Sequence, residues 1–401
     1  MQSQAQQPAK TPQDPQRRDM NTHLSATENT ALPERLMRIQ HARRAVLGEG
    51  RPSVNGGHWV EPWIDQSWRR CMAQGLHPQQ ALDFHTLSVP GIRRALEASE
   101  PLLQAAAPVI ASLARTMADT HHFAILTNAD GVVIDVNGPI DRHNPHAHLI
   151  ARVGVDLSEN TVGTTAIGAC LAEQQPVWLH RGEHFFDDTS VYSCAGAPVF
   201  GPDGRCVGVL DLTGVMVNER PALRHLVAQS ARRIENALTL VQPHSLLLRL
   251  NWPGSATESD SAGLVCVNSE GLVTGSNRAA ADMLGLLPGM PGQHCNDLFA
   301  VPFQSLFDAA RHEQAERELP LWSGLRLLVK VQLGGHRARP VAASPGQAAA
   351  KVPLKEVETA LIRQAVQEAR GNVMEAARAL GISRATVYRK LMRKPSCDDK
   401  A

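Results

Sequence analysis

The stretch GNVMEAARALGISRATVYRKL, residues 371–391, decides how the end of this chain folds. It divides into two short helical segments around Gly381, and Asn372 and Ser383 stand where the N-cap of each helix is expected. Apolar side chains recur at helical spacing in both segments, so the two helices can pack on each other. Two short helices joined by a tight glycine turn are typical of a helix-turn-helix.

Basic charge gathers in the second of these segments. Six Lys or Arg residues and no acidic residue occur between 378 and 394, which suits a helix that meets phosphates and base edges. A longer apolar-periodic segment precedes the pair, so residues 352–394 are expected to form a three-helix unit. An ordinary helical hairpin with a solvated basic face is the alternative, but the turn glycine, the caps and the charge all favour DNA binding.

The elements Gly-Asn-Val, Ala-Ala-Arg, Leu-Gly-Ile and Thr-Val-Tyr-Arg-Lys-Leu resemble the Fis-type DNA-binding domain that ends many bacterial enhancer-binding activators. The resemblance implies double-stranded DNA as a partner. The start of the recognition helix would address bases and nearby phosphates, and the later basic residues would address mostly phosphates. The predicted DNA-binding residues are Asn372, Ser383, Arg384, Thr386, Tyr388, Arg389, Lys390 and Arg393.

Composition limits the remaining possibilities. The chain has 401 residues, 43% of them hydrophobic, and a formal net charge of +1, so the basic character is local to the C-terminal segment. The seven cysteines form no Cys-x-x-Cys pair, which favours reduced thiols over a disulfide framework. We find no stretch long and apolar enough for a membrane span or a signal peptide. We therefore expect a cytoplasmic protein that is nucleoid-associated when bound to DNA.

The pattern along the chain predicts an α+β protein of several domains. The expected divisions are a disordered tail over residues 1–30, a helical region over 31–118, a GAF-like domain over 119–243, a PAS-like domain over 260–334, a flexible linker over 335–351 and the helix-turn-helix over 352–394.

Two β-rich runs indicate hairpins within the larger domain. FAILTNADGVVIDV, residues 123–136, turns at Asp130-Gly131, and APVFGPDGRCVGVLDLTG, residues 197–214, turns at Pro202-Asp203-Gly204. Between them lie a glycine-rich helix start, residues 158–175, and a short strand, and a long amphipathic helix follows up to Val241. Antiparallel hairpins flanked by helices predict an α+β sandwich with room for a pocket over the sheet.

Several short segments here resemble the N-terminal sensor region of the acetoin and dihydroxyacetone regulator family, whose core is a GAF domain. They are IDQSWRRCMAQGLHP, VGTTAIG, EHF, SCAGAP and GVLDLTG. The resemblance implies a small polar metabolite as effector. Thr165 stands where that family commonly has Asn, so the ligand itself is left open.

A helix N-terminus with short hydroxyls suits a carbonyl or polyol oxygen. The predicted effector-binding residues are Asn160, Thr164, Thr165, Glu183, His184, Phe185, Cys194 and Asp211. The alternative for any single residue is structural, with the hydroxyls capping the helix and the Glu183-His184 pair holding the loop.

Neither a metal nor a cofactor is expected. His180, Glu183 and His184, and the segment HNPHAH at 143–148, bring metal-ligand side chains together, but both lie among loop-forming residues without thiolates at zinc-finger spacing. Cys194 carries no sign of a catalytic role, because many buried cysteines are inert. We therefore assign no catalytic residue.

The segment AGLVCVNSEGLVTGSNRAAADMLGL, residues 262–286, resembles a PAS domain. Its pattern predicts a strand, a turn at Glu270-Gly271, a second strand and a helix that opens after Asn277. A structural and dimerising spacer is favoured here over a second sensor.

The sequence contains no motif of an ATPase domain. In the sigma-54 activators that share both ends of this chain, an AAA+ domain lies between sensor and DNA reader, yet the sequence contains no Gly-x-x-x-x-Gly-Lys-Ser/Thr loop and little room between Val241 and Pro353. We expect a non-enzymatic homodimer in which effector binding changes operator affinity without ATP hydrolysis, with RNA polymerase as a further partner. Two alternatives are an antagonist that forms mixed dimers with an ATPase-bearing relative and a GAF-based redox enzyme that uses Cys194.

Overall fold

The computed structural model describes residues 34–50, 59–117, 120–141, 143–289, 292–311, 316–334 and 373–374. The chain divides into two compact units, residues 1–335 and 336–401. In the second unit the described residues Val373 and Met374 are helical. The rest of the expected helix-turn-helix, the linker and the N-terminal tail lie outside the described residues.

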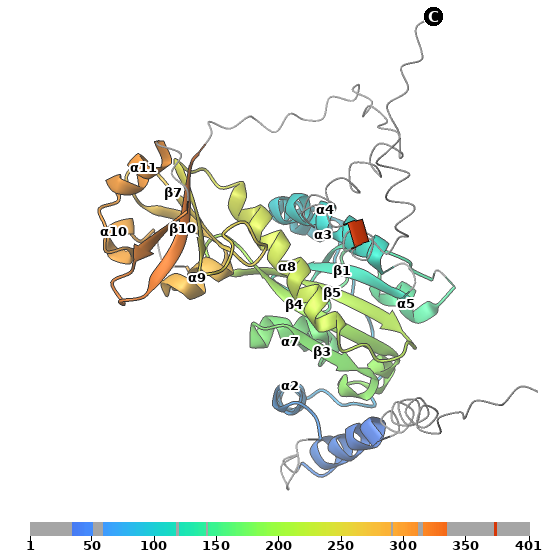
Figure 1. The fold of residues 1–401 in the computed structure, drawn as a ribbon. Helices are drawn as coiled ribbons and strands as arrows, with labels where there is room; N and C mark the ends of the chain where they lie inside the picture. Colours follow the sequence, from blue (N-terminus) through green and yellow to red (C-terminus); the bar gives the residue numbers. More distant parts are fainter. Residues whose placement is uncertain are drawn as a thin grey trace, which may run out of the picture. The chain divides into compact units, whose positions relative to one another are not determined.

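A five-stranded antiparallel sheet forms the centre of the N-terminal α+β domain, residues 59–241 (Figure 1). The strand order is β2-β1-β5-β4-β3, with β1 at His122–Asn128, β2 at Val133–Asn137, β3 at Val177–His180, β4 at Tyr192–Phe200 and β5 at Cys206–Val215. The hairpins β1–β2 and β4–β5 pair as the two β-rich runs predict. Their turns contain Gly131 and Gly204, whose positive φ angles of 82° and 78° favour glycine.

The two faces of this sheet build two separate cores. Along β1, Phe123 and Ile125 belong to one core, whereas Ala124 and Leu126 belong to the other, as the two-residue repeat of a strand requires. Helices α4, Glu100–Thr116, and α8, Leu223–Leu240, cover the face of the second core. Helix α7, Ala166–Glu173, lies against β4 and β5 on the opposite face, which builds the first core, the one that contains Phe123 and Ile125.

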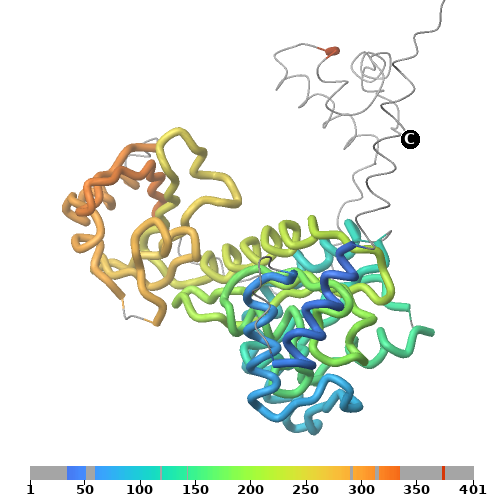
Figure 2. The backbone as a smooth tube through the Cα atoms, turned by 90° about the horizontal axis from the view of Figure 1, so that it is seen from below, coloured from blue at the N-terminus to red at the C-terminus, as the bar shows by residue number. Residues whose placement is uncertain are grey.

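The described residues between 34 and 117 form several separate helices. Residues 34–43 are helical and continue as the π-helical turn η2, Arg44–Gly48, followed by α2, Pro62–Ala73, and α3, Val89–Ala98. Helix α3 ends just before Ser99, and α4 starts directly after it with Pro101 in its first turn, where the missing N–H of proline leaves no helix hydrogen bond unmade. Shorter helices are α5 at Pro145–Ile150, α6 at Glu159–Val162, η3 at Arg181–Glu183 and η4 at Asp187–Val191. In Figure 2 the blue N-terminal segments lie beside the green part of the domain.

A second five-stranded sheet forms the second α+β domain, residues 244–334. Its order is β8-β7-β6-β10-β9, with β6 at Leu246–Asn251, β7 at Gly263–Val267, β8 at Val273–Ser276, β9 at Arg317–Pro320 and β10 at Arg326–Leu333. Helices α9, Arg278–Leu284, α10, Cys295–Leu298, and α11, Gln304–Arg311, complete it. As predicted, α9 opens after Asn277, whose side chain accepts the Ala280 N–H. The central strand β6 lies ahead of residue 260, so this domain begins earlier in the chain than the sequence predicts.

Candidate effector cavity

A small cavity of about 30 Å³ lies in the N-terminal α+β domain between the sheet and the start of α7. That space holds one or two water-sized groups, so any ligand must be small or must open the site further. The cavity is lined by Phe84, Ile125, Ile150, Leu157, Thr165, Ala166, Ile167, His184, Thr189, Tyr192, Cys194, Asp211 and Thr213. Most of these side chains are apolar, so the few polar atoms determine what can bind.

The alternation of β4 and β5 brings three polar side chains to the cavity. Val209 belongs to the first core, and Asp211 and Thr213, two and four residues further along β5, lie on the same face of the sheet. Thr213 Oγ1 donates to Asp211 Oδ2 and lies 3.4 Å from Cys194 Sγ. Asp211 Oδ1 is buried without a hydrogen-bond partner among the described residues. Burial raises the pKa of Asp211 to about 7, because a charged carboxylate is poorly solvated there.

His184 contributes a second unpaired atom from the loop between η3 and η4. Its Nδ1 lies 2.9 Å from the carbonyl oxygen of Arg181, an arrangement that requires a proton on Nδ1 and leaves Nε2 as an acceptor. Nε2 is buried and has no partner in the part of the chain that the structure describes. Burial lowers the pKa of His184 to about 4, so the ring is neutral near pH 7.

These two atoms give the cavity a defined chemistry. The His184 lone pair can accept a hydrogen bond from a ligand hydroxyl. Asp211 can donate to a carbonyl oxygen when it is protonated, and it can accept from a hydroxyl when it is ionised. A buried polar atom without a partner is costly, so a ligand that supplies both missing bonds would bind at the lowest cost in desolvation.

The structure brings four of the eight predicted effector residues together on this cavity: Thr165, His184, Cys194 and Asp211. Thr165 also N-caps α7, with its Oγ1 accepting the Gly168 N–H at 3.1 Å. The Thr165 side chain thus caps α7, as the structural alternative predicts, and also lines the cavity.

The other four predicted residues lie away from the cavity. Thr164 is buried beside α2, and Asn160 accepts a hydrogen bond from the Gln74 side chain at 2.9 Å. Glu183 pairs with Arg35 at 2.8 Å and accepts the His180 N–H at 2.7 Å, as the structural alternative predicts. Phe185 is buried in the first core, with its ring edge-on to Phe186.

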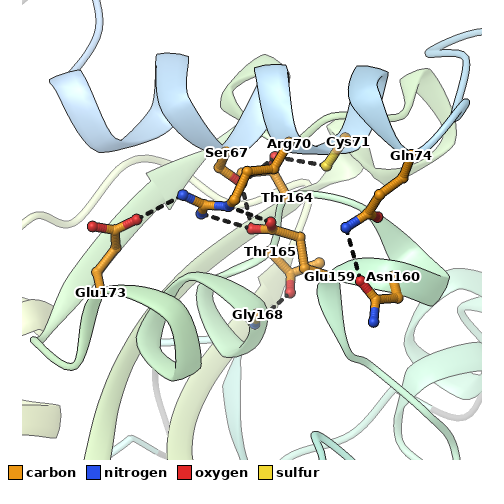
Figure 3. A network of polar contacts seen from close by, with 10 residues as sticks. All are labelled: Ser67, Arg70, Cys71, Gln74, Glu159, Asn160, Thr164, Thr165, Gly168 and Glu173. Atoms are coloured by element: carbon orange, nitrogen blue, oxygen red, sulfur yellow. Dashed lines mark hydrogen bonds and ion pairs between the residues drawn. The ribbon is translucent and has the colours of Figure 1, made fainter.

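A polar network joins α2 to the helix start beside the cavity (Figure 3). Arg70 pairs with Glu159 at 2.7 Å and with Glu173 at 3.0 Å. Ser67 Oγ donates to Glu159 at 2.6 Å and lies 2.7 Å from Thr164 Oγ1. These partners lie 89 to 103 residues apart in sequence, so no local sequence motif predicts them.

A second connection reaches the loop that carries His184. The Arg43 guanidinium donates to the carbonyl oxygens of Gly182, His184 and Phe185 at 3.0, 2.6 and 3.1 Å, and to Asp187 Oδ1 at 2.6 Å. The N-terminal helical region therefore holds both the loop and the helix start that frame the cavity.

The cavity has no features of a metal or nucleophile site. Among the described residues there is no group of three His, Cys, Asp or Glu side chains that could hold a metal ion. Cys194 is a buried thiol whose pKa is raised by burial, which keeps it in the weakly nucleophilic protonated form. Within the part searched, no helix has the length and apolar character to cross a membrane. The eight predicted DNA-binding residues lie outside the described residues.

Two segments of the chain match families of known proteins. Residues 39–236 match the family model of the MimR N-terminal domain, and residues 353–393 match that of the bacterial regulatory proteins of the Fis family. The acetoin catabolism regulatory protein of Cupriavidus necator is 28% identical over 68% of this chain and 41% of that protein. The propane 2-monooxygenase operon transcriptional activator MimR of Mycolicibacterium goodii is 31% identical over 50% of this chain and 33% of that protein.

The chain thus spans less than half the length of these relatives. Among solved structures, the E. coli DhaR(N)-DhaL complex aligns over 68% of this chain and 100% of that chain, with 16% identity and a TM-score of 0.42. The two family matches agree with the sensor-type and helix-turn-helix segments expected from the sequence. The chain thus carries a segment that matches the MimR N-terminal domain and a segment that matches the bacterial regulatory proteins of the Fis family.

Proposed function

We propose that this protein is a DNA-binding transcriptional regulator whose operator affinity is controlled by a small hydroxycarbonyl or polyol bound in the cavity of the N-terminal α+β domain. The observation that carries the proposal is the pair of buried, unpartnered atoms, His184 Nε2 and Asp211 Oδ1, which belong to two side chains that line one cavity within the described part of the chain. A hydroxyketone presents a hydroxyl donor and a carbonyl acceptor on adjacent carbons, which matches these two atoms. Acetoin, named in the description of one relative, is such a molecule and is the first probe.

The regulator would act without ATP hydrolysis of its own. The sequence has no phosphate-binding loop, and the segment between the second α+β domain and the Fis-type match is only 18 residues, 335–352. Effector binding would favour one geometry of a homodimer and so shift operator affinity by about 1–3 kcal/mol, a usual size for coupling between two sites. The two recognition helices would then read an inverted repeat.

Calorimetric titration of the full chain with acetoin tests the ligand part of the proposal. We expect binding to the wild type and a loss of about tenfold or more in Asp211→Asn or His184→Gln, since each change alters a buried hydrogen bond. Asp83→Asn is the matched control, because that carboxylate is largely exposed. Equal affinity of all four proteins for acetoin would show that the cavity is not the binding site.

A second candidate role follows from the short alignment with the relatives. Because the chain covers 41% and 33% of them, it could pair with a longer, ATPase-bearing relative and antagonise it through mixed dimers. Co-purification with such a relative, together with no operator binding by the isolated chain, would favour this role. An enzymatic role for Cys194 has less support, because its thiol is buried and protonated.

A further inference from the structure

A cleft of about 360 Å³ lies where the two α+β domains of the first unit meet. One wall consists of α8, the end of β4 and the α7–β3 connection, and the other consists of residues 260–261 and the start of α9. The β4 and α8 wall includes the apolar residues Ala197, Pro198 and Ala231. Nothing in the effector proposal uses this cleft, which shares no lining residue with the effector cavity.

Direct bonds hold the two walls of the cleft together. Asn277 Nδ2 donates to Asn236 Oδ1 at 2.7 Å, and Arg233 pairs with Asp260 at 2.8 Å. The backbone N–H of Ser276 donates to the carbonyl oxygen of Pro202 at 2.9 Å. These bonds fix the positions of the cleft walls. A ligand inside the cleft would contact both domains.

Glu235 is the buried charged side chain that determines which ligands this cleft can bind. It is 4% exposed, lines the cleft from α8, and accepts the Phe200 N–H through Oε1 at 3.0 Å. Within the described part of the chain we find no hydrogen bond or ion pair to Oε2. Burial raises the pKa of Glu235 to about 7, while the Phe200 N–H and the Arg278 and Arg232 guanidinium groups act in the opposite direction. A cationic donor at Oε2 would remove that penalty.

The other charged side chains of the cleft are paired, with one exception. Arg278 pairs with Asp282 at 3.1 Å and lies over the Phe200 ring at 4.6 Å, and Asp260 is held by Arg233. Arg232 lines the cleft one helical turn before Glu235, is exposed, and forms no ion pair within the described residues. A buried carboxylate and an unpaired guanidinium thus remain on one face of α8.

We propose that this cleft binds a small zwitterion of the α-amino acid class, with its ammonium on Glu235 and its carboxylate on Arg232. The ammonium supplies the missing N–H donors to Oε2, and the guanidinium offers two parallel donors to a carboxylate. Since both domains form the walls, occupancy would stiffen their junction and give the regulator a second chemical input.

Calorimetry on the full chain tests this site, with each standard amino acid, ethylamine and propionate as separate probes. We expect at least one amino acid to bind and neither ethylamine nor propionate to bind comparably, because each of these carries only one of the two charges. Glu235→Gln should weaken binding about tenfold or more. The glutamine side-chain oxygen can still accept the Phe200 N–H, so that variant should fold with unchanged or higher thermal stability. Arg232→Gln should weaken binding similarly.

Two control variants establish whether an amino acid binds in this cleft or elsewhere on the protein. Arg205→Gln removes an exposed guanidinium outside the cleft and should leave amino acid binding unchanged. Asp211→Asn alters the effector cavity and should also leave it unchanged, so failure of the effector proposal does not affect this one. Binding by no amino acid, or binding that survives in Glu235→Gln and Arg232→Gln, would overturn the proposal.

Discussion

Replacing Arg43 by methionine should loosen the loop that carries His184. The change removes the donors to three loop carbonyl oxygens, those of Gly182, His184 and Phe185, and to Asp187. The Asp187 carboxylate is 58% exposed, so its share is small. The three carbonyl bonds at about 1 kcal/mol each give a loss of about 3 kcal/mol in the free energy of unfolding. Methionine keeps most of the apolar stem that packs in this region.

Urea unfolding, followed by tryptophan fluorescence, measures that loss. Trp68 is a local reporter, because its Nε1 donates to the carbonyl oxygen of Glu183 in the same loop at 2.9 Å. Hydrogen exchange over residues 181–191 should accelerate in Arg43→Met and remain unchanged in Arg115→Met, which removes an exposed guanidinium with no hydrogen bond or ion pair to the described residues. A free energy of unfolding within about 0.5 kcal/mol of the wild type, with unchanged exchange, would refute the assigned role of Arg43.

Three further predictions concern pH, packing and DNA. Burial raises the pKa of Asp211 from 3.8 to about 7, so the folded state keeps a proton that the unfolded state releases, and this contribution to stability is lost as pH rises from about 4 to about 7. Asp211→Asn should therefore be more stable than the wild type by about 1–4 kcal/mol near pH 8, and this gain should vanish near pH 4, in urea titrations at both pH values. Gly168→Ala should cost about 1–3 kcal/mol in thermal unfolding, because its Cβ would lie 3.0 Å from a backbone nitrogen of α6. Gly48→Ala, with no atom near its Cβ, should cost little. In DNA titrations Arg384→Ala should lose about 1–3 kcal/mol on the specific site only, whereas Lys390→Ala should lower the salt slope by about 1 on any DNA.

Local periodicity made much of the fold predictable. The two hairpins of the N-terminal α+β domain, the long helix α8 and the start of α9 after Asn277 all appear where the patterns place them. Each depends on residues within a few positions of one another, such as a turn glycine or an N-cap side chain. The place of β6 was not predictable in this way, because its neighbours β7 and β10 are chosen by long-range pairing.

The candidate site was predictable only in part, for a related reason. Thr164 and Thr165 are adjacent, but one lies against Ser67 of α2 and the other lines the cavity. Choosing between them requires the direction of each side chain, which a glycine-rich helix start does not reveal. Arg43 and its loop partners are 139 to 144 residues apart, so no spacing rule connects them. The place of Asp211 could be predicted from the sequence, because the two-residue alternation along β5 fixes which side chains share a face of the sheet.

The most direct test of effector-controlled DNA binding is a quantitative footprint of the full chain on the DNA upstream of its own gene. The titration is performed with and without acetoin and a panel of small carbonyls and polyols. We predict a protected site whose half-saturation shifts about 5- to 150-fold with one of these compounds, and a shift that disappears in Asp211→Asn. Protection that is identical at every effector concentration, or no protection by the folded protein, would contradict effector-controlled binding.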